Sequence, residues 1–321
     1  MSSKTVVIAN PRSGGGATER RWGEFAAVLG DTLGSFEHRF TRDVGDGTRL
    51  AREALAAGFD LVVAMGGDGT VSEVASGFFD GERATHPEAV LGILPGGTGG
   101  DFLRTLGIPR TFAEAARGLR GTTTRRIDVG LLEYTLEGGA QASRHFTNIA
   151  SFGLGGVVDR IINSSRPPSF LGLRPGALGG KLAYLAATLQ GGLQYKNQRV
   201  KITLDDGEPQ YKTIQSVAVA NGRYFGGGMH IAPGASVDDG RFDVITLGDL
   251  GPMDFLKRGY KVYLGTHIGS PKIECQRASL VRAWPIDPKE AVLLDVDGEA
   301  PGQLPATFRI LPGALRVKVE G

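Results

Sequence analysis

The chain contains the stretch Leu61-Val62-Val63-Ala64-Met65-Gly66-Gly67-Asp68-Gly69-Thr70-Val71-Ser72-Glu73, in which an apolar run ends in a glycine-rich turn. The five apolar residues are typical of a buried strand. Thr70 and Glu73 have the spacing of a capping box, which predicts that a helix begins at this turn. Glycine backbone N–H groups and a helix N-terminus both favour anions, so the turn is suited to bind phosphate.

Two more glycine-rich turns follow predicted strands at residues 6–9 and 90–94. They are Asn10-Pro11-Arg12-Ser13-Gly14-Gly15-Gly16 and Pro95-Gly96-Gly97-Thr98-Gly99-Gly100-Asp101. Because the carboxyl ends of parallel strands meet at one edge of a sheet, we expect the three turns to form one cradle for the phosphates of a nucleotide. None of them has the Walker A ending or the spacing of a dinucleotide fingerprint.

The wider pattern divides the chain into two domains. Helical patterns at 18–29, 48–57, 70–79 and 111–119 alternate with short strands, including one at 38–40, and predict an α/β domain with a parallel sheet over residues 1–126. Strand-like segments at 127–136, 145–152, 199–204, 214–220, 242–247 and 291–296 predict an antiparallel domain over 127–306. Helical stretches at 181–189 and 253–264 and a long loop at 164–180 interrupt this second part.

Composition limits the partners and the compartment. The 36 Lys and Arg nearly balance the 34 Asp and Glu, and no dense basic run occurs, so no nucleic acid partner is expected. A single cysteine, Cys275, indicates a reducing compartment. The strand pattern begins directly at Thr5, which leaves no room for a signal peptide, and no apolar run is long enough to span a bilayer. We expect a cytoplasmic protein that meets the inner face of a membrane only transiently. The sequence leaves open whether the protein forms a homodimer.

Together the motifs resemble the diacylglycerol kinase catalytic domain family, above all its small bacterial lipid kinases, with sphingosine, ceramide and NAD kinases as relatives. The resemblance covers nearly the whole chain. Besides the three turns and Glu73, it rests on Asp128-Val129-Gly130, residues 148–153, Asp238-Asp239-Gly240-x-Phe242-Asp243 and Asp297-Gly298-Glu299. It implies a β-sandwich as the second domain, an active site in the interdomain cleft, and a return of residues 307–321 to the first domain through strands at 308–311 and 315–319.

The resemblance also implies a reaction and residue roles. The chain would use ATP and Mg²⁺ to phosphorylate the hydroxyl of a diacylglycerol-like lipid at a membrane surface, with Asp68 and Glu299 as catalytic residues and Glu299 as general base. The implied nucleotide contacts are Asn10, Pro11, Ser13, Gly14, Gly66, Gly67, Gly69, Thr70, Glu73, Gly96, Gly97 and Thr98. A structural Mg²⁺ would bind the Asp239 carboxylate and the backbone carbonyls of Ser236 and Arg241. By pattern alone, Asp297-Gly298 is typical of a hairpin turn.

Two positions depart from the family pattern. Ser72 and Gly100 stand where the family usually has asparagine, and we expect both to face the nucleotide and to weaken its binding. Two alternatives to a lipid kinase remain open. An NAD kinase-like enzyme shares the central motif, although the first and third turns favour the lipid family. A nucleotide- or lipid-binding regulator with weakened catalysis would explain the two departures, although the presence of Asp68 and Glu299 argues against it.

Overall fold

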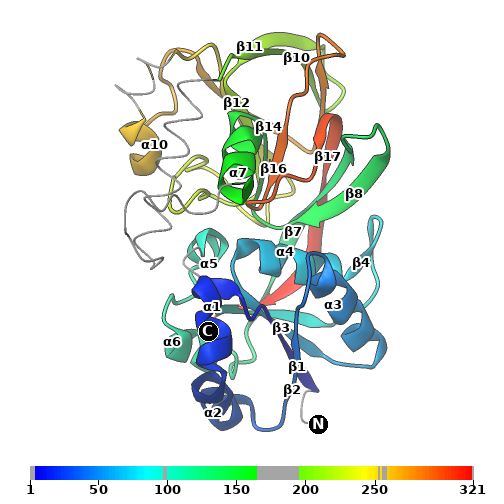
Figure 1. Cartoon of the computed structure of the whole chain (residues 1–321), viewed down its shortest axis with the longest axis vertical. Coiled ribbons are helices and arrows are strands. Elements are labelled where there is room, and N and C mark those ends of the chain that lie inside the picture. The colour runs from blue at the N-terminus through cyan, green and yellow to red at the C-terminus, as the bar shows by residue number, and fades with distance from the viewer. Residues whose placement is uncertain (1–3, 97–99, 165–194, 252–253, 255–258, 320–321) are drawn as a thin grey trace.

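A computed structural model of the chain describes residues 4–96, 100–164, 195–251, 254 and 259–319. The amino-terminal half forms an α/β domain and the carboxyl-terminal half a β-rich domain, one above the other in Figure 1. The predicted helix at 181–189 and the predicted loop, apart from its first residue, lie outside the described residues. Among the described residues, no helix is long and apolar enough to cross a membrane.

The first domain is built on a parallel sheet in the order β2-β1-β3-β6. These strands are β1 (Thr5–Ala9), β2 (Glu37–Phe40), β3 (Leu61–Gly66) and β6 (Val90–Pro95). The helices are α1 (Ser13–Arg20), α2 (Trp22–Leu33), α3 (Asp46–Ala56), α4 (Asp68–Ser76), α5 (Asp101–Leu106) and α6 (Phe112–Gly118), and β4 (Phe79–Asp80) pairs with β5 (Arg83–Ala84). Every residue of β1 and β3 is buried, because α3 and α4 cover one side of the sheet and α2 and α6 the other (Figure 1). The predicted α/β domain is confirmed.

The second domain consists of two antiparallel sheets packed face to face. The first contains β7 (Thr124–Thr135), β8 (Gln141–Phe146), β10 (Gln198–Leu204), β11 (Gln210–Ile214), β15 (Leu280–Pro285) and β17 (Gln303–Lys318). The second contains β9 (Ile149–Gly153), β12 (Ser216–Ala220), β13 (Phe242–Leu247), β14 (Ile273–Ala278) and β16 (Leu294–Val296). Phe146, Phe152, Phe242 and Phe308 are fully buried between the sheets. This packing confirms the sandwich.

One strand ties the domains together. The first part of β17 pairs with β15, most of its length pairs with β7, and its end lies parallel to β6, with Arg316 beside Val90. The sequence predicts two short strands in this region, but the structure has a single 16-residue strand with an irregularity between Leu311 and Leu315. A ten-stranded sheet therefore runs through both domains. The predicted boundary at residue 126 falls inside β7.

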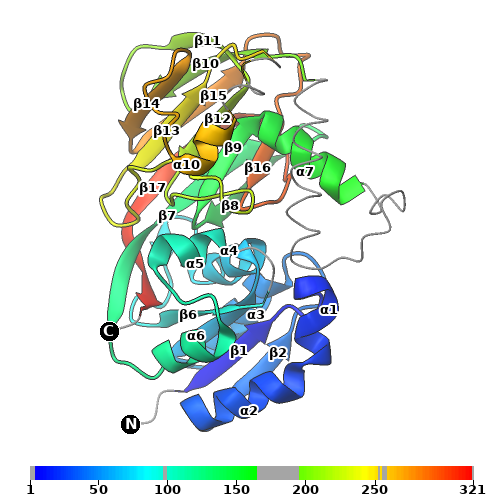
Figure 2. The same cartoon turned by 90° about the vertical axis from the view of Figure 1, so that its left-hand side faces the viewer.

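Some predicted elements are divided differently. The predicted helix at 18–29 is two helices, because α1 ends and α2 begins around Arg21. The predicted strand at 145–152 is β8 followed by β9, which belong to different sheets. Helices α5 and α7 (Leu154–Ser164) are additional, and the described part of the predicted helix at 253–264 is α10 (Tyr260–Leu264). In Figure 2, α5, α7 and α10 lie on the side that faces the viewer.

Candidate active site

A cavity of about 810 Å³ lies between the two domains. From the first domain it is lined by Asn10, Arg12, Ser13, Gly14, Thr41, Arg42, Asp43, Val44, Gly67, Gly69, Thr70 and Glu73. From the second domain it is lined by Tyr134, Arg144, Asp297, Gly298, Glu299, Ala300 and Pro301. The structure thus gathers the first two glycine-rich turns and Glu299 around one space.

Hydrogen bonds hold the three turns against one another. The Asn10 side-chain amide donates to the Thr70 hydroxyl over 3.3 Å, which joins the first turn to the second. The Thr18 hydroxyl contacts the Ser13 hydroxyl at 2.6 Å and donates to the Gly96 carbonyl over 3.1 Å, which joins the first turn to the third. The turns therefore form one unit at the carboxyl ends of β1, β3 and β6, as the sequence predicts.

The glycines of these turns have different tasks. Gly14, Gly15 and Gly16 adopt positive φ angles between 60° and 79°, which other residues rarely adopt. Gly96 instead lies so close to Gly66 that a Cβ atom on Gly96 would come within 2.9 Å of the Gly66 backbone. Gly66 and Gly96 therefore allow β3 and β6 to end side by side. The carbonyl of Pro11 accepts a hydrogen bond from the backbone of Glu19, and Gly97 and Thr98 lie outside the described residues.

The carboxylate of Asp68 holds the N-terminus of α5. It accepts hydrogen bonds from the backbone N–H groups of Gly100, Asp101 and Phe102 over 3.4, 3.2 and 3.1 Å. Burial raises the pKa of Asp68, although these three bonds counteract the shift. Gly67 and Gly69 line the cavity, whereas Asp68 is not among its lining residues. Sequence reasoning does not anticipate this capping role, because α5 itself is not predicted.

Asp101 extends the contact to the second domain. Its carboxylate accepts a hydrogen bond of 2.8 Å from the backbone N–H group of Gly227. Burial, reinforced by the negative charge of Asp68, raises the pKa of Asp101 to about 6. The start of α5 is therefore held from both sides, by Asp68 of the first domain and by the backbone of the second.

Glu299 stands at the end of a tight hairpin turn. Asp297 and Gly298 have φ angles of 50° and 86°, and Val296 and Glu299 exchange two backbone hydrogen bonds. Positive φ at both central residues is what the predicted Asp-Gly hairpin requires. The turn brings the Glu299 carboxylate against the beginning of α4, where a Cβ atom on Gly69 would lie 3.1 Å from it.

Arg144 is a site residue that the sequence does not reveal. It lies on β8, its side chain is only 17% exposed, and its guanidinium donates to Glu299 over 2.9 Å. The two residues are 155 positions apart in the chain and share no local motif. Arg144 places a positive charge beside the candidate base and orients that carboxylate toward the cavity.

Asp297 is a buried carboxyl group beneath the same turn. It accepts hydrogen bonds from the backbone N–H groups of Thr147 and Ile149 over 3.0 and 2.9 Å, and so fixes the point where the chain passes from β8 to β9. Burial raises the pKa of Asp297 to about 6, while these bonds and the Ser72 hydroxyl oppose the shift.

We predict that Asp297 makes stability fall as pH rises. Because its pKa is raised in the folded state, the stabilisation is complete below the ordinary pKa of 3.8 and is lost as pH rises through about 6. Between about pH 4 and about pH 7, the wild type should lose roughly 2 to 3 kcal/mol more free energy of unfolding than Asp297→Asn. Urea unfolding of both proteins at the two pH values measures this difference. Asp101 is unchanged in both proteins, so its contribution cancels in the difference. Parallel profiles of unfolding free energy against pH in the two proteins would contradict a raised pKa of Asp297.

The two departures from the family pattern have different surroundings. Ser72 is fully buried and its hydroxyl donates to the carbonyl of His145 over 3.2 Å, so it braces α4 against β8 and does not face the cavity. The expectation that Ser72 faces the nucleotide is wrong. Gly100 has a φ angle of 110°, a conformation that favours glycine, and its N–H donates to Asp68.

Glu73 lines the cavity, but its carboxylate is hydrogen-bonded to a neighbouring helix. Its carboxylate accepts hydrogen bonds from the backbone N–H groups of Gly45 and Gly47 over 2.7 and 2.9 Å, at the start of α3. Burial raises the pKa of Glu73, and the charge of Glu299 adds to the shift. The capping box that the sequence indicates within one helix is thus replaced by a cap between two helices.

The predicted metal-binding residues lie in a separate acidic turn before β13. Asp239 accepts a backbone hydrogen bond of 3.1 Å from Arg241 and forms an ion pair with Arg277. Burial raises the pKa of Asp128 and of Asp243, and the negative charge of Asp239 adds to both shifts. One carboxylate oxygen of Asp243 is buried without a hydrogen-bond partner among the described residues. A buried carboxylate oxygen without a hydrogen-bond partner fits a nearby bound cation.

A metal ion in this turn would need backbone carbonyl groups among its ligands. The hydroxyl of Ser236 donates to Asp238, whose carboxylate also pairs with Arg125. Within the described ranges, no three His, Cys, Asp or Glu side chains gather so that they could hold a metal. The oxygen chemistry therefore fits the predicted set of one carboxylate and two carbonyls, which stays a prediction.

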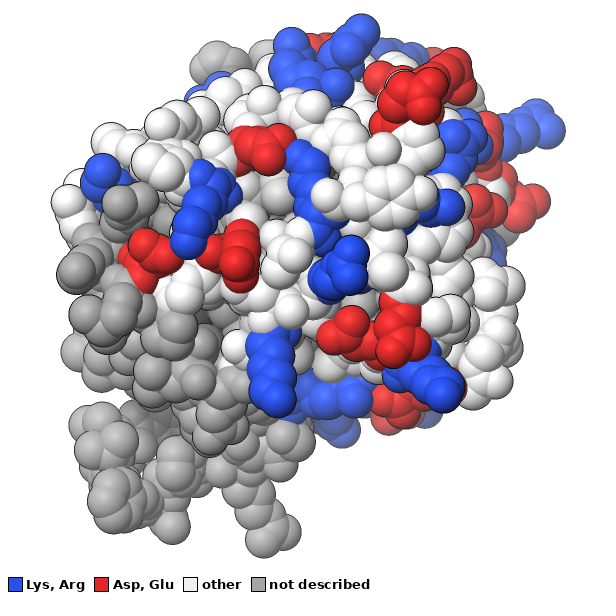
Figure 3. All heavy atoms as spheres, turned by 90° about the horizontal axis from the view of Figure 1, so that it is seen from above, with Lys and Arg blue, Asp and Glu red and all other residues white. Residues whose placement is uncertain are grey.

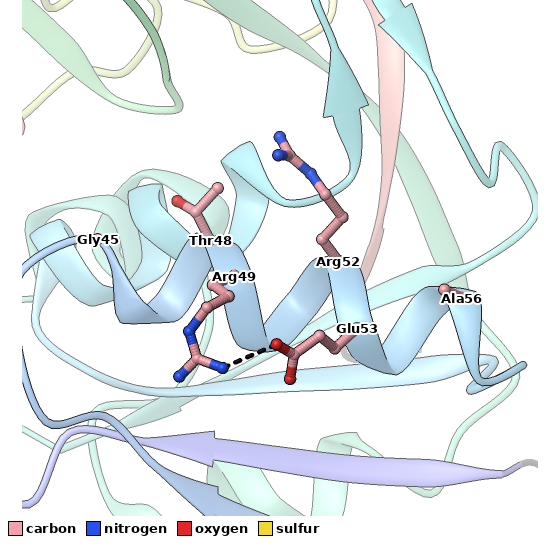
Figure 4. A pocket seen from close by; sticks show the side chains of 6 residues that line it. All are labelled: Gly45, Thr48, Arg49, Arg52, Glu53 and Ala56. Carbon is pink, nitrogen blue, oxygen red and sulfur yellow. Dashed lines mark hydrogen bonds and ion pairs between the residues drawn. The ribbon is translucent and has the colours of Figure 1, made fainter.

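A second cavity, of about 480 Å³, lies along α3 and is shown in Figure 4. Its cationic side chains already have partners. Arg49 pairs with Asp46 and Glu53, and Arg52 donates to the carbonyl of Phe79. This cavity does not bring carboxylates together with the glycine-rich turns, so the interdomain cavity is the better candidate.

Comparisons with known proteins agree with this geometry. The family model "Diacylglycerol kinase catalytic domain" matches residues 4–132, and "YegS C-terminal NAD kinase beta sandwich-like domain" matches residues 148–319. A protein of Chromohalobacter salexigens named "Probable lipid kinase YegS-like" is 32% identical over 277 residues, which cover 86% of this chain and 81% of the relative. A diacylglycerol kinase of Bacillus subtilis is 30% identical over 310 residues, which cover 94% and 91%. A Bacillus anthracis crystal structure assigned as a diacylglycerol kinase is similar, with a TM-score of 0.74, 26% identity and coverage of 98% and 96%.

Proposed function

The chain belongs to the family of diacylglycerol kinases and YegS-like lipid kinases, and from this premise we propose that it transfers the γ-phosphoryl group of ATP to the hydroxyl of a diacylglycerol-like lipid. The product would be a phosphatidic-acid-like lipid. The observation that carries the proposal is the interdomain cavity, in which the glycine-rich turns of one domain face Glu299 of the other.

The first domain supplies the anion-binding groups. Gly67, Gly69 and Thr70 line the cavity at the N-terminus of α4, where free backbone N–H groups and the helix dipole favour negative charge. Asn10, Ser13 and Gly14 extend this surface from the first turn. Phosphoryl transfer depends mainly on positioning and on charge compensation, so a rigid cradle of this kind suits the reaction. Bound with the nucleotide, Mg²⁺ would offset charge on the phosphate oxygens.

The second domain supplies the proton acceptor. Glu299 approaches Gly69 and is oriented by Arg144 across 2.9 Å. In the proposed reaction its carboxylate takes the proton of the lipid hydroxyl as that oxygen attacks phosphorus. Asp68 acts by fixing the start of α5 beside the reacting groups, through its three backbone hydrogen bonds. The lipid would be met at the surface of a membrane, with the chain bound peripherally.

The experiment offers radiolabelled ATP to the purified protein with separate acceptors: diacylglycerol, phosphatidylglycerol, a sphingoid base, ceramide and NAD. We expect Mg²⁺-dependent label in the diacylglycerol product. Label in NADP without labelled lipid would replace the proposal with the NAD kinase alternative. Nucleotide binding without transfer to any acceptor would indicate the regulator.

The structural Mg²⁺ site has its own prediction. Mg²⁺ bound only by the folded state raises the melting temperature, so Asp239→Ala should reduce or remove this rise. Asp287→Ala is a matched control, because Asp287 accepts a backbone hydrogen bond from Lys289, two residues on, just as Asp239 does from Arg241. Thermal melting with and without Mg²⁺ measures both. An equal rise in Asp239→Ala and in the wild type would place the metal elsewhere.

A further inference from the structure

An exposed apolar patch surrounds α10. Of the seven large hydrophobic side chains that are exposed among the described residues, four lie between positions 260 and 268. They are Tyr260, Tyr263, Leu264 and Ile268, with exposed fractions of 59%, 43%, 64% and 36%. Single exposed apolar residues are common, but a cluster of this kind marks an interaction site.

The patch is firmly attached to the sandwich. The carbonyl of Val262 accepts a hydrogen bond of 3.0 Å from the backbone of His230, and Val262 packs against the core on the outer face of the second sheet. His267 is buried, and its ring nitrogen Nε2 lies 2.9 Å from the carbonyl oxygen of Ile231. Because Val262 and His267 point inward, the exposed side chains cannot turn into the core.

Basic side chains border the patch. Arg104 lies 3.9 Å above the ring of Tyr224, which stacks on His230 at 4.3 Å, and Gly265 of the patch segment packs directly against the same His230 ring. The backbone N–H of Arg223 donates to Thr105 on α5. Burial lowers the pKa of His230, and the positive charges of both arginines add to the shift.

A third cation, Lys261, belongs to α10 itself. Arg104 and Arg223 are exposed, and neither they nor Lys261 takes part in an ion pair with another described residue.

The patch lies beside the start of α5. The negative charge of Asp101 adds to burial in raising the pKa of the Tyr263 hydroxyl, so this ring lies near the carboxylate at the start of α5. That start is held by Asp68. Both α10 and α5 lie on the left of Figure 1 and face the viewer in Figure 2. A flat partner bound to the patch would thus lie next to the start of α5.

We propose that Tyr260, Tyr263, Leu264 and Ile268, bordered by Arg104, Arg223 and Lys261, form the surface by which the protein docks on an anionic lipid bilayer. The choice of a bilayer rests on the proposed function, since the lipid acceptor resides there. The chemistry matches: tyrosine rings favour the headgroup level, leucine and isoleucine enter the acyl boundary, and cations outside ion pairs attract anionic headgroups.

Vesicle sedimentation without ATP tests the docking surface on the full chain. The probes are vesicles of phosphatidylcholine mixed with phosphatidylglycerol, and of phosphatidylcholine alone. We expect binding to the mixed vesicles, and a roughly tenfold loss of that binding in the double variant Tyr260→Ser, Leu264→Ser. Tyr211→Ser is the control, because Tyr211 is 69% exposed and lies outside the patch on β11, at the top of Figure 1. Seen from above in Figure 3, that end of the molecule carries acidic and basic residues intermixed. Equal binding by the double variant and the wild type, or no binding by either, would overturn the proposal.

A second readout separates docking from catalysis. On a dispersed short-chain diacylglycerol the double variant should keep wild-type turnover within about twofold, while on diacylglycerol in vesicles it should lose roughly tenfold. If the wild type phosphorylates no lipid, the proposed function fails, and vesicle binding still decides the docking surface. Light scattering tests the alternative that a second copy of the chain covers the patch. If the wild type is a dimer, and the double variant is a monomer that still binds vesicles normally, the patch is an interface between two copies and the proposal is overturned.

Discussion

Glu299→Gln should lower turnover at least about 100-fold while the protein remains folded, which is the loss expected when a general base is removed. Glutamine has the size of glutamate, and its amide oxygen can still accept the hydrogen bond from Arg144. It cannot take up the proton of a lipid hydroxyl. The structure therefore predicts a large effect on turnover and a small one on the melting temperature.

Initial rates at saturating ATP and lipid, together with thermal melting, measure this effect. Glu274→Gln is the matched control, because Glu274 also pairs with a single cation, Lys212, but lies on β14, away from the cavity. Its turnover should stay within about twofold of the wild type. Near-normal turnover in Glu299→Gln would remove Glu299 from the reaction and leave its pair with Arg144 as a contact between β8 and the hairpin turn.

Asp68→Ala should lower turnover by a similar factor and also destabilise the protein, by roughly 2 to 5 kcal/mol. The family resemblance implies a catalytic role for Asp68 and gives no structural one. The structure changes this expectation, because alanine would leave the N–H groups of Gly100, Asp101 and Phe102 without their acceptor. The start of α5 would lose its cap.

Asp68→Asn separates the two roles. Asparagine keeps one side-chain oxygen that can accept from the start of α5, so stability should recover in part, whereas the negative charge is gone. Chemical unfolding and initial rates of both variants give the answer. If turnover recovers along with stability in Asp68→Asn, Asp68 acts only through the position of α5. If turnover stays low while stability recovers, the charge itself takes part in the reaction.

The sequence predicts best where local chemistry decides the structure. Three of the parallel strands, β1, β3 and β6, are short apolar runs followed by glycine-rich turns, so the α/β domain and the meeting of the turns can be inferred before any coordinates are known. The hairpin at Asp297 and Gly298 is equally local, since its positive φ angles follow from the residue types.

It predicts least where a side chain binds a distant part of the chain. Arg144 reaches Glu299 from another strand, and Glu73 caps α3 although its spacing from Thr70 suggests a cap within α4. Ser72 occupies a position that looks nucleotide-facing but turns toward β8. Helix periodicity shows which residues share one face of a helix, but it does not show which element packs against that face. The local sequence therefore does not identify the partner of such a side chain.

The continuous strand β17 limits how this protein can be divided. Residues 1–126 expressed alone would lack β17, so β6 would present an unpaired strand edge. The second domain ending before β17 would likewise lose the partner that lies between β7 and β15. Open edges of this kind recruit other chains and promote aggregation. A fragment or chimaera that contains either domain should therefore also contain β17. The last strand of the chain is thus a structural part of both domains, although it is far from the first domain in the sequence.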